Sequence, residues 1–352
     1  MKIYKFITQI SIAGCMLVGT PMLQGCMDNS LNDPLGKVSE EELGRDGFAA
    51  NAFFLTLCDY AYPIATENIY NTNESLIGDC YGRYQVMATD KFKGANFATY
   101  NAPENWLNWQ FADDNVMVLT YGAWNKIKNV TQGTGVNFAW AQILRIATMH
   151  RMLDMYGALP YSQISSDKLS TPYDTMEEAY HAMFTDLTDA INVMTVYVTE
   201  NPNNRTMAKY DKVYDGDFEK WVKFANSLKL RMAIRIRFAD REYARQMAEE
   251  AINHSIGVIT SNEDNATSLG TKNQLYTVLV QWPDQCVSAD ITSYMKGYND
   301  PRMSKYFKKK TSDKGDDDYV GMRAGLSYGN DITGPTFSRI NVGEMDRTLW
   351  MS

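Results

Sequence analysis

The stretch from Phe138 to Tyr156 constrains the fold most strongly, because it has the length of a helix and is apolar on most of its sides. A helix that is hydrophobic nearly all round belongs in the interior of a protein. Gly157 follows the stretch and Pro160 comes three residues later, which is the usual signature of a helix end. We therefore expect a buried central helix. Its apolar side chains are Trp140, Ile143, Leu144, Ile146, Ala147, Met149, Met152 and Leu153.

Helical patterns also flank this stretch on both sides. The pattern is clearest over Asp217–Phe238, where the apolar residues form one stripe at helical spacing. Asp174 followed by Glu177 is a variant of the capping box and predicts the start of another helix. Because the gaps are short, we expect a mostly α fold in which antiparallel helix pairs stack side by side, as in helical-repeat proteins. The remaining expected helices are Glu41–Tyr60, Asp113–Val130, the one from Asp174 to about Thr195, and Arg241–His254.

Two regions lack a helical signal. Residues 61–105 are rich in Asn, Gly and Tyr, and we expect them to be irregular. Beyond Gly257 we expect a short strand at Thr277–Gln281 and a short helix at Ile291–Lys296. Residues 308–334 are charged and glycine-rich, which is typical of a loop.

The amino-terminal residues have the pattern of a bacterial lipoprotein signal. Lys2 and Lys5 precede a mostly apolar stretch, Phe6–Thr20, which is too short and too often interrupted for a membrane span. Leu23-Gln24-Gly25-Cys26 has the lipobox form Leu-x-Gly-Cys, so we expect cleavage before Cys26 and an acylated thiol that anchors the chain in a membrane. The expected organisation is a signal peptide over residues 1–25, a polar tether over 26–40 and one helical domain over 41–352.

Composition argues against several functions. A chain with a formal net charge of −8 is a poor partner for nucleic acid, because phosphate contacts need a basic surface. Beyond the anchor, the cysteines are Cys58, Cys80 and Cys286; we favour buried free thiols, although Cys58 and Cys80 could pair. No cysteine or histidine spacing suits zinc. We therefore expect neither a metal site nor a cofactor.

Three segments of the chain carry a family resemblance. They are Ala141–Ala147 with Leu153–Ser162, then Trp221–Ala233, and then Asn299–Met303. In this order they resemble the SusD/RagB-type outer-membrane lipoproteins of Bacteroidetes, and the lipobox is an independent feature of the same family. The resemblance covers almost the whole chain from Cys26 onward.

This resemblance implies tetratricopeptide-like helix pairs and an irregular ligand-binding region. It also implies a cell-surface nutrient-binding subunit that covers a TonB-dependent, SusC-like transporter and performs no catalysis. Ligands in the family are usually oligosaccharides, and in the RagB branch they are peptides. Family members commonly run beyond this length, and Leu349–Ser352 looks like the entry to a further helix. We therefore expect a helical domain that is incomplete at its C-terminus.

Aromatic-rich segments supply the side chains that sugar binding requires. Aromatic rings stack on the apolar faces of a sugar, whereas amides, carboxylates and arginines bind its hydroxyls. The family places its ligand site in loops like the segment from Gly78 to Gln110 and the stretch Gln281–Asp284. The predicted stacking residues are Tyr81, Tyr84, Trp106, Trp109 and Trp282. The predicted polar contacts are Asp79, Arg83, Asn108 and Asp284.

Other interpretations stay open at this point. Each of these aromatic residues could instead pack in the core or against the transporter. The fold could bind peptides, or the chain could be a glycosidase or a structural lipoprotein. Adjacent acids such as Asp113 and Asp114 do not converge on one substrate atom, which weakens the glycosidase hypothesis. One basic set is more typical of a solvated face than of an anion site: Lys220, Lys223, Lys229, Arg231, Arg235 and Arg237.

Overall fold

The computed structural model describes residues 48–61, 67–89, 97–111, 115–165, 170–268, 276–282, 284–310, 318–326, 337–341 and 349–351. The predicted signal peptide, the anchor Cys26 and the tether lie outside these ranges. From Ala50 onward the described residues belong to one compact unit, Ala50–Ser352.

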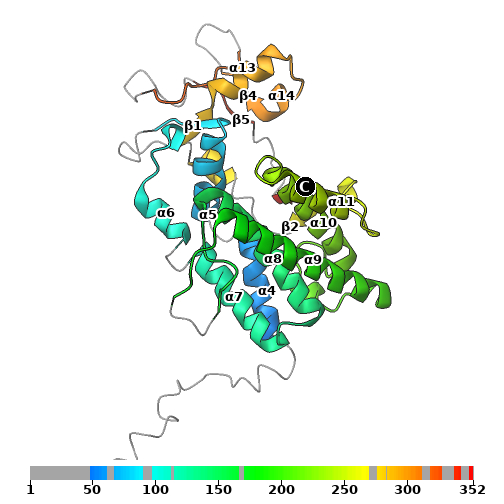
Figure 1. Ribbon diagram of the computed structural model, residues 1–352. Helices are drawn as coiled ribbons and strands as arrows, with labels where there is room; N and C mark the ends of the chain where they lie inside the picture. The colour runs from blue at the N-terminus through cyan, green and yellow to red at the C-terminus, as the bar shows by residue number, and fades with distance from the viewer. Residues whose placement is uncertain are drawn as a thin grey trace, which may run out of the picture. The chain divides into compact units, whose positions relative to one another are not determined.

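The predicted central helix is α8, Gly135–Tyr156, which packs against α7, Val116–Thr131, and α9, Met176–Glu200 (Figure 1). Every side chain from 139 to 150 is buried, as expected for a helix that is apolar nearly all round. At its centre Trp140 stacks on Phe54 at 4.4 Å between ring centroids and lies 5.7 Å from the ring of Trp221. Because those two rings belong to α4, Phe48–Ala61, and to α10, Phe218–Ile236, the central helix is enclosed from several sides.

Helices α10, Phe218–Ile236, and α11, Arg241–Ile252, continue the same layer. Helix α10 packs on both α9 and α11, so each helix from α7 to α11 contacts the next one along the chain (Figure 1). The apolar stripe predicted on α10 is buried, including Trp221, Val222 and Met232. The expected mostly α architecture of stacked helix pairs is therefore confirmed.

The region from 61 to 105 is more ordered than the sequence suggested. It holds a continuous helical segment made of α5, Glu67–Tyr70, and the π-helical η2, Asn71–Asp79. A 3-10 turn η3, Phe97–Thr99, and helix α6, Glu104–Phe111, follow. Leu76 is fully buried and Ile77 nearly so, so burial of a few apolar side chains outweighs the many turn-forming residues around them. The expectation of an irregular segment was wrong for this part.

Short antiparallel strand pairs join distant parts of the chain. Strand β1, Gln85–Met87, pairs with β3, Gln285–Val287, with Val86 opposite Cys286. This pairing brings the end of η2 beside residues 200 positions later in the chain. The other pairs are β2, Ala266–Ser268, with β6, Leu349–Met351, and β4, Phe307–Lys308, with β5, Arg339–Ile340.

Two expectations in the C-terminal half need correction. Thr277–Gln281 forms a π-helical turn, η6, and not a strand. Its Val278 and Leu279 are buried, so the β-branched, apolar composition serves packing here and does not decide the backbone. Leu349–Met351 forms strand β6 where the sequence suggested the entry to a helix. The predicted short helix is present as α13, Ala289–Gly297, and the short α14, Met303–Tyr306, follows it.

The three cysteines of the described residues are buried free thiols, as the sequence favoured. They are Cys58, Cys80 and Cys286. Burial raises the pKa of both Cys80 and Cys286 to about 12, so both stay protonated and unreactive at neutral pH.

Candidate functional site

The turn between η2 and β1 holds three of the predicted ligand-binding residues, and a fourth, Asp79, is the last residue of η2. Tyr81 is partly buried and its ring lies 4.9 Å from that of Tyr100. The Arg83 guanidinium lies 5.8 Å from the centre of the same Tyr100 ring, and Arg83 forms a 3.6 Å ion pair with Asp290 on α13. Tyr84 is 55% exposed. The turn therefore presents aromatic faces and a cationic donor within a few residues.

The β1–β3 pairing places the second predicted segment next to this turn. The backbone N–H of Ala88 donates to the Asp284 carbonyl at 2.7 Å. Gln285 Nε2 donates to the Ser75 carbonyl at 2.7 Å, and the Ser75 hydroxyl donates back to Gln285 Oε1. Asp284 itself is buried. The structure therefore brings the segment at 284 beside the η2–β1 turn, as the hypothesis of a shared site requires.

The remaining aromatic candidates divide between two environments. Trp106 on α6 contacts Phe97 edge-on at 6.1 Å. It packs on a small apolar cluster that includes Leu76, Val86 and Phe97. Trp109, on the same helix, packs against the main helical core. Asn108 is exposed, and Trp282 is partly buried at the end of η6. Trp109 thus has a packing role here, whereas Trp106 adjoins the turn.

Asp79 differs electrostatically from the other polar candidates. Gln85 Nε2 donates to its carboxylate at 2.5 Å. Burial raises the pKa of Asp79 to about 7, although the hydrogen bond from Gln85 opposes this shift. Near neutral pH the carboxyl can therefore either donate or accept a hydrogen bond.

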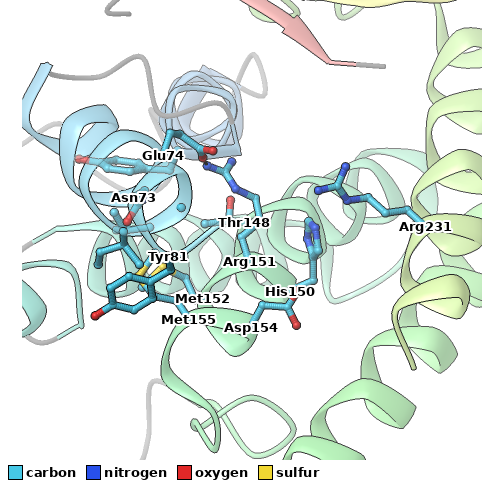
Figure 2. A pocket seen from close by; sticks show the side chains of 14 residues that line it. Asn73, Glu74, Tyr81, Thr148, His150, Arg151, Met152, Asp154, Met155 and Arg231 are labelled. Carbon is cyan, nitrogen blue, oxygen red and sulfur yellow. Dashed lines mark hydrogen bonds and ion pairs between the residues drawn. The ribbon is translucent and has the colours of Figure 1, made fainter. Parts of the chain in front are cut away.

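A cavity of about 280 Å³ lies beside Tyr81, between η2, α8 and α10. Figure 2 shows Glu74 from η2 and Tyr81 from the turn after it on one side, and Arg231 reaching in from α10 on the other. Arg151 pairs with Glu74 and also donates from Nη1 to the Ala61 carbonyl at 3.0 Å. The cavity thus combines an aromatic face with charged groups.

The inner wall of the cavity includes a buried histidine. His150 Nδ1 lies 2.9 Å from the Ile146 carbonyl oxygen. Burial is the main cause that lowers the pKa of His150 to about 4, and the charge of Arg231 acts in the same direction. The ring is therefore neutral at physiological pH. Because a carbonyl only accepts, Nδ1 carries the proton and Nε2 carries the lone pair.

Sequence reasoning missed this cavity, because its polar residues come from three helical segments far apart in the chain. Asp154 on α8 has partners within the protein, because it accepts from the Tyr180 hydroxyl at 2.6 Å and from Arg235 at 3.0 Å, and Arg151 pairs with Glu74. They also line the cavity, together with His150. The available signal was the cluster of polar residues near the C-terminal end of an otherwise apolar helix.

One group of possible metal ligands occurs among the described residues. Glu177, His181 and Asp240 each offer an atom within 4.8 Å of the others, although sequence spacing gave no hint of it. His181 Nε2 already contacts Asp240 Oδ2 at 3.3 Å, and Asp240 Oδ1 accepts from the backbone N–H of Tyr243 as the cap of α11. These interactions account for the grouping, so we assign no ion to it.

Comparison with known proteins identifies the family. The model of the family described as "SusD-like: Susd and RagB outer membrane lipoprotein" matches residues 30–352. The chain belongs to the SusD-like family. This confirms the resemblance inferred from the three sequence segments. No curated protein matches the chain.

Solved structures agree with this SusD-like assignment. A SusD-like protein from Bacteroides thetaiotaomicron VPI-5482 is 32% identical, with a TM-score of 0.74 over 86% of this chain and 62% of its own. A SusD homologue from Bacteroides uniformis ATCC 8492 is 35% identical, with a TM-score of 0.75 over 87% and 63%. A chitin-binding SusD homologue from Flavobacterium johnsoniae is 29% identical, with a TM-score of 0.74 over 86% and 62%. The SusD-like chain thus spans a little over three fifths of each structure.

The family description also bears on the membrane. SusD-like proteins are described as outer-membrane lipoproteins. Within the part of the chain that the structure describes, no helix combines the length and the apolar character needed to cross a bilayer.

Proposed function

We propose that this SusD-like chain captures oligosaccharides at the bacterial cell surface and delivers them to a TonB-dependent, SusC-like transporter. Its binding site is the η2–β1 turn with the adjoining cavity, and the protein is held in the outer membrane through acylated Cys26. The ligand contacts are the predicted residues of the turn and of the segment ending at Asp284, extended by the polar wall of α8.

The position of Tyr81 is the observation that carries this proposal. Its ring takes part in the aromatic pair with Tyr100 and also lines the cavity. An aromatic face next to hydrogen-bonding groups suits a sugar ring, which has apolar faces and a polar rim. One of the similar structures is a chitin-binding SusD homologue, which supports a saccharide ligand.

We propose binding without catalysis. Two carboxylates at the cavity already form ion pairs: Glu74 pairs with Arg151, and Asp154 pairs with Arg235 at 3.0 Å. A carboxylate that accepts hydrogen bonds from its cationic partner holds no proton to give to a leaving group. Turnover of a bound oligosaccharide by the pure protein would contradict this part.

The test is calorimetric titration with a panel of oligosaccharides and peptides, using the full chain and Tyr81→Ala. Losing a ring that buries one face of a sugar removes roughly 1–3 kcal/mol, so we expect affinity to fall by about 5- to 150-fold. The matched control is Tyr294→Ala, because Tyr294 on α13 is 70% exposed and does not line the cavity. Equal losses in both variants, or none in Tyr81→Ala, would contradict the assignment.

The same panel separates the competing ligand classes. Binding of peptides alone would favour the RagB-like alternative. Delivery is tested separately, by co-purification of the chain with a β-barrel transporter from membranes of the source bacterium. A chain that binds oligosaccharide but never co-purifies with such a partner would retain the binding proposal and lose the transport step.

A further inference from the structure

We infer that the cavity between η2, α8 and α10 selects an acidic sugar, whose carboxylate binds Arg231 and whose neighbouring hydroxyl donates to His150. This inference rests on the proposed function and names the ligand class of the same site. It follows from the charges at the cavity, their pairing and the hydrogen-bonding capacity of the inner wall.

Most charged groups at the cavity already have partners. Glu74 is paired with Arg151 from α8. Asp154 is paired with Arg235 at 3.0 Å and accepts a further hydrogen bond from the Tyr180 hydroxyl at 2.6 Å. These contacts neutralise both carboxylates of the wall, so they do not compete for a second cation.

Arg231 is different. It lines the cavity from α10 and is exposed, and it forms no ion pair with any residue that the structure describes. Its neighbours in the basic set of α10 do pair: Lys223 with Asp264 at 2.9 Å and buried Lys229 with Glu250 at 2.6 Å. Lys220 and Arg237 also lack an ion pair with a described residue, but they donate to the Glu263 and Ile234 carbonyls. Arg231 is the member of this basic set that lines the cavity. A guanidinium holds a carboxylate through two parallel hydrogen bonds, which suits it to an anionic ligand.

His150 supplies the complementary acceptor. With Nδ1 donating to the Ile146 carbonyl, the neutral ring leaves the Nε2 lone pair for a donor such as a sugar hydroxyl. Figure 2 shows the Arg231 side chain extending toward His150 across the cavity. A carboxylate and an adjacent hydroxyl on one ring, as in a uronic acid, match this donor and acceptor together.

The size of the cavity and the local charge at Arg231 both agree with an acidic sugar. The cavity volume of about 280 Å³ is just below the range of about 300–1,000 Å³ usual for small-molecule sites, so it suits one sugar residue of a longer chain. The chain as a whole carries a net charge of −8 and so repels anions at long range. Preference for an acid must therefore arise from the local cation, within the Debye length of about 8 Å at physiological salt.

The experiment compares uronic-acid oligosaccharides with their methyl esters, which have the same ring and lack the charge. In calorimetric titrations of the full chain we expect the acid to bind at least tenfold more tightly than the ester. Arg231→Met should abolish this ratio, and Arg231→Lys should restore part of it. The control is Arg237→Met, which changes the net charge equally at an exposed position outside the cavity lining and should leave the ratio unchanged.

A second variant tests the acceptor separately. His150→Phe keeps a ring but removes Nε2, so it should weaken acid and ester alike while keeping their ratio. If this variant does not fold, the Arg231→Met and Arg231→Lys variants still test whether the cavity prefers an acidic sugar. Equal binding of acid and ester, a ratio that survives Arg231→Met, or Arg231-dependent binding of peptides with no acidic sugar bound would each overturn the inference. Neutral oligosaccharides that bind alone would leave the proposed function standing, whereas the absence of all saccharide binding would remove both.

Discussion

At the scale of single residues, buried polar groups determine how this fold responds to pH. Asp79 is enclosed between η2 and β1, and burial raises its pKa to about 7, well above the usual value for an aspartate. Between about pH 4 and pH 7 the folded protein therefore keeps a proton that the unfolded chain has lost. The stabilisation is complete below about pH 4 and is lost as the pH rises toward 7.

Asp79→Asn should remove this dependence, because an amide has no proton to lose. We expect the variant and the parent to be about equally stable at pH 4. At pH 8 the variant should be more stable by about 1–3 kcal/mol, after discounting a shift of about three pKa units for partial exposure. Urea unfolding at both pH values measures the difference. Asp189→Asn, at an exposed position on α9, is the control, and an equal pH response in the two variants would contradict the assignment to Asp79.

The residues that sequence could predict are those that lie close together along the chain. Tyr81, Arg83 and Tyr84 lie within four positions of one another, so a local run of aromatic and polar residues was enough to propose them together. Sequence could not separate Trp106 from Trp109, because three positions along a short helix decide which of two apolar clusters each ring meets. The cavity could not be predicted from the sequence, because residues far apart in the chain, such as Glu74 and Arg231, line it only after the helices have packed.

At the scale of elements, the helices were predictable because their apolar residues repeat at helical spacing over many residues. The ends of the helices were harder to predict, because neighbouring side chains compete for the same backbone N–H groups. The cap of α9 shows this. Asp174 was the predicted cap, but its carboxylate accepts from the backbone N–H groups of Tyr161 and Ser162 at 2.9 and 2.7 Å. The capping box therefore forms one residue later, from Thr175 and Glu178.

Thr175→Ala should destabilise the protein by about 1 kcal/mol, because it leaves the N–H of Glu178 without its acceptor at the start of α9. Thr175→Ser keeps the hydroxyl and should retain most of the stability. Chemical denaturation of both variants measures the two free energies of unfolding. Equal losses in the serine and alanine variants would show that the methyl group, and not the cap, contributes the stability.

At the scale of the whole molecule, the described part of the chain buries its apolar side chains in separate clusters. The main cluster lies within the helical layer, and a smaller one around Leu76, Val86 and Phe97 lies beneath the candidate site. Segments near 76–107 and 285–326 both contribute to the smaller cluster. The geometry of the site therefore depends on the β1–β3 pairing, while the helical layer provides the frame against which the cavity forms.

Attachment of the molecule to a membrane is proposed to depend on Cys26, in agreement with a family described as outer-membrane lipoproteins. Cys26→Ala in the full chain, expressed in a bacterium that processes lipoproteins, should abolish labelling by palmitate and move the protein from the membrane to the soluble fraction, because two or three acyl chains supply most of the binding energy. Cys15→Ala makes the same change within the predicted signal and should alter neither result. Cys58, Cys80 and Cys286 are buried in the folded protein and out of reach of an acyl donor. Palmitate that persists in Cys26→Ala would therefore place the anchor outside the lipobox and remove the basis for the proposed cleavage site.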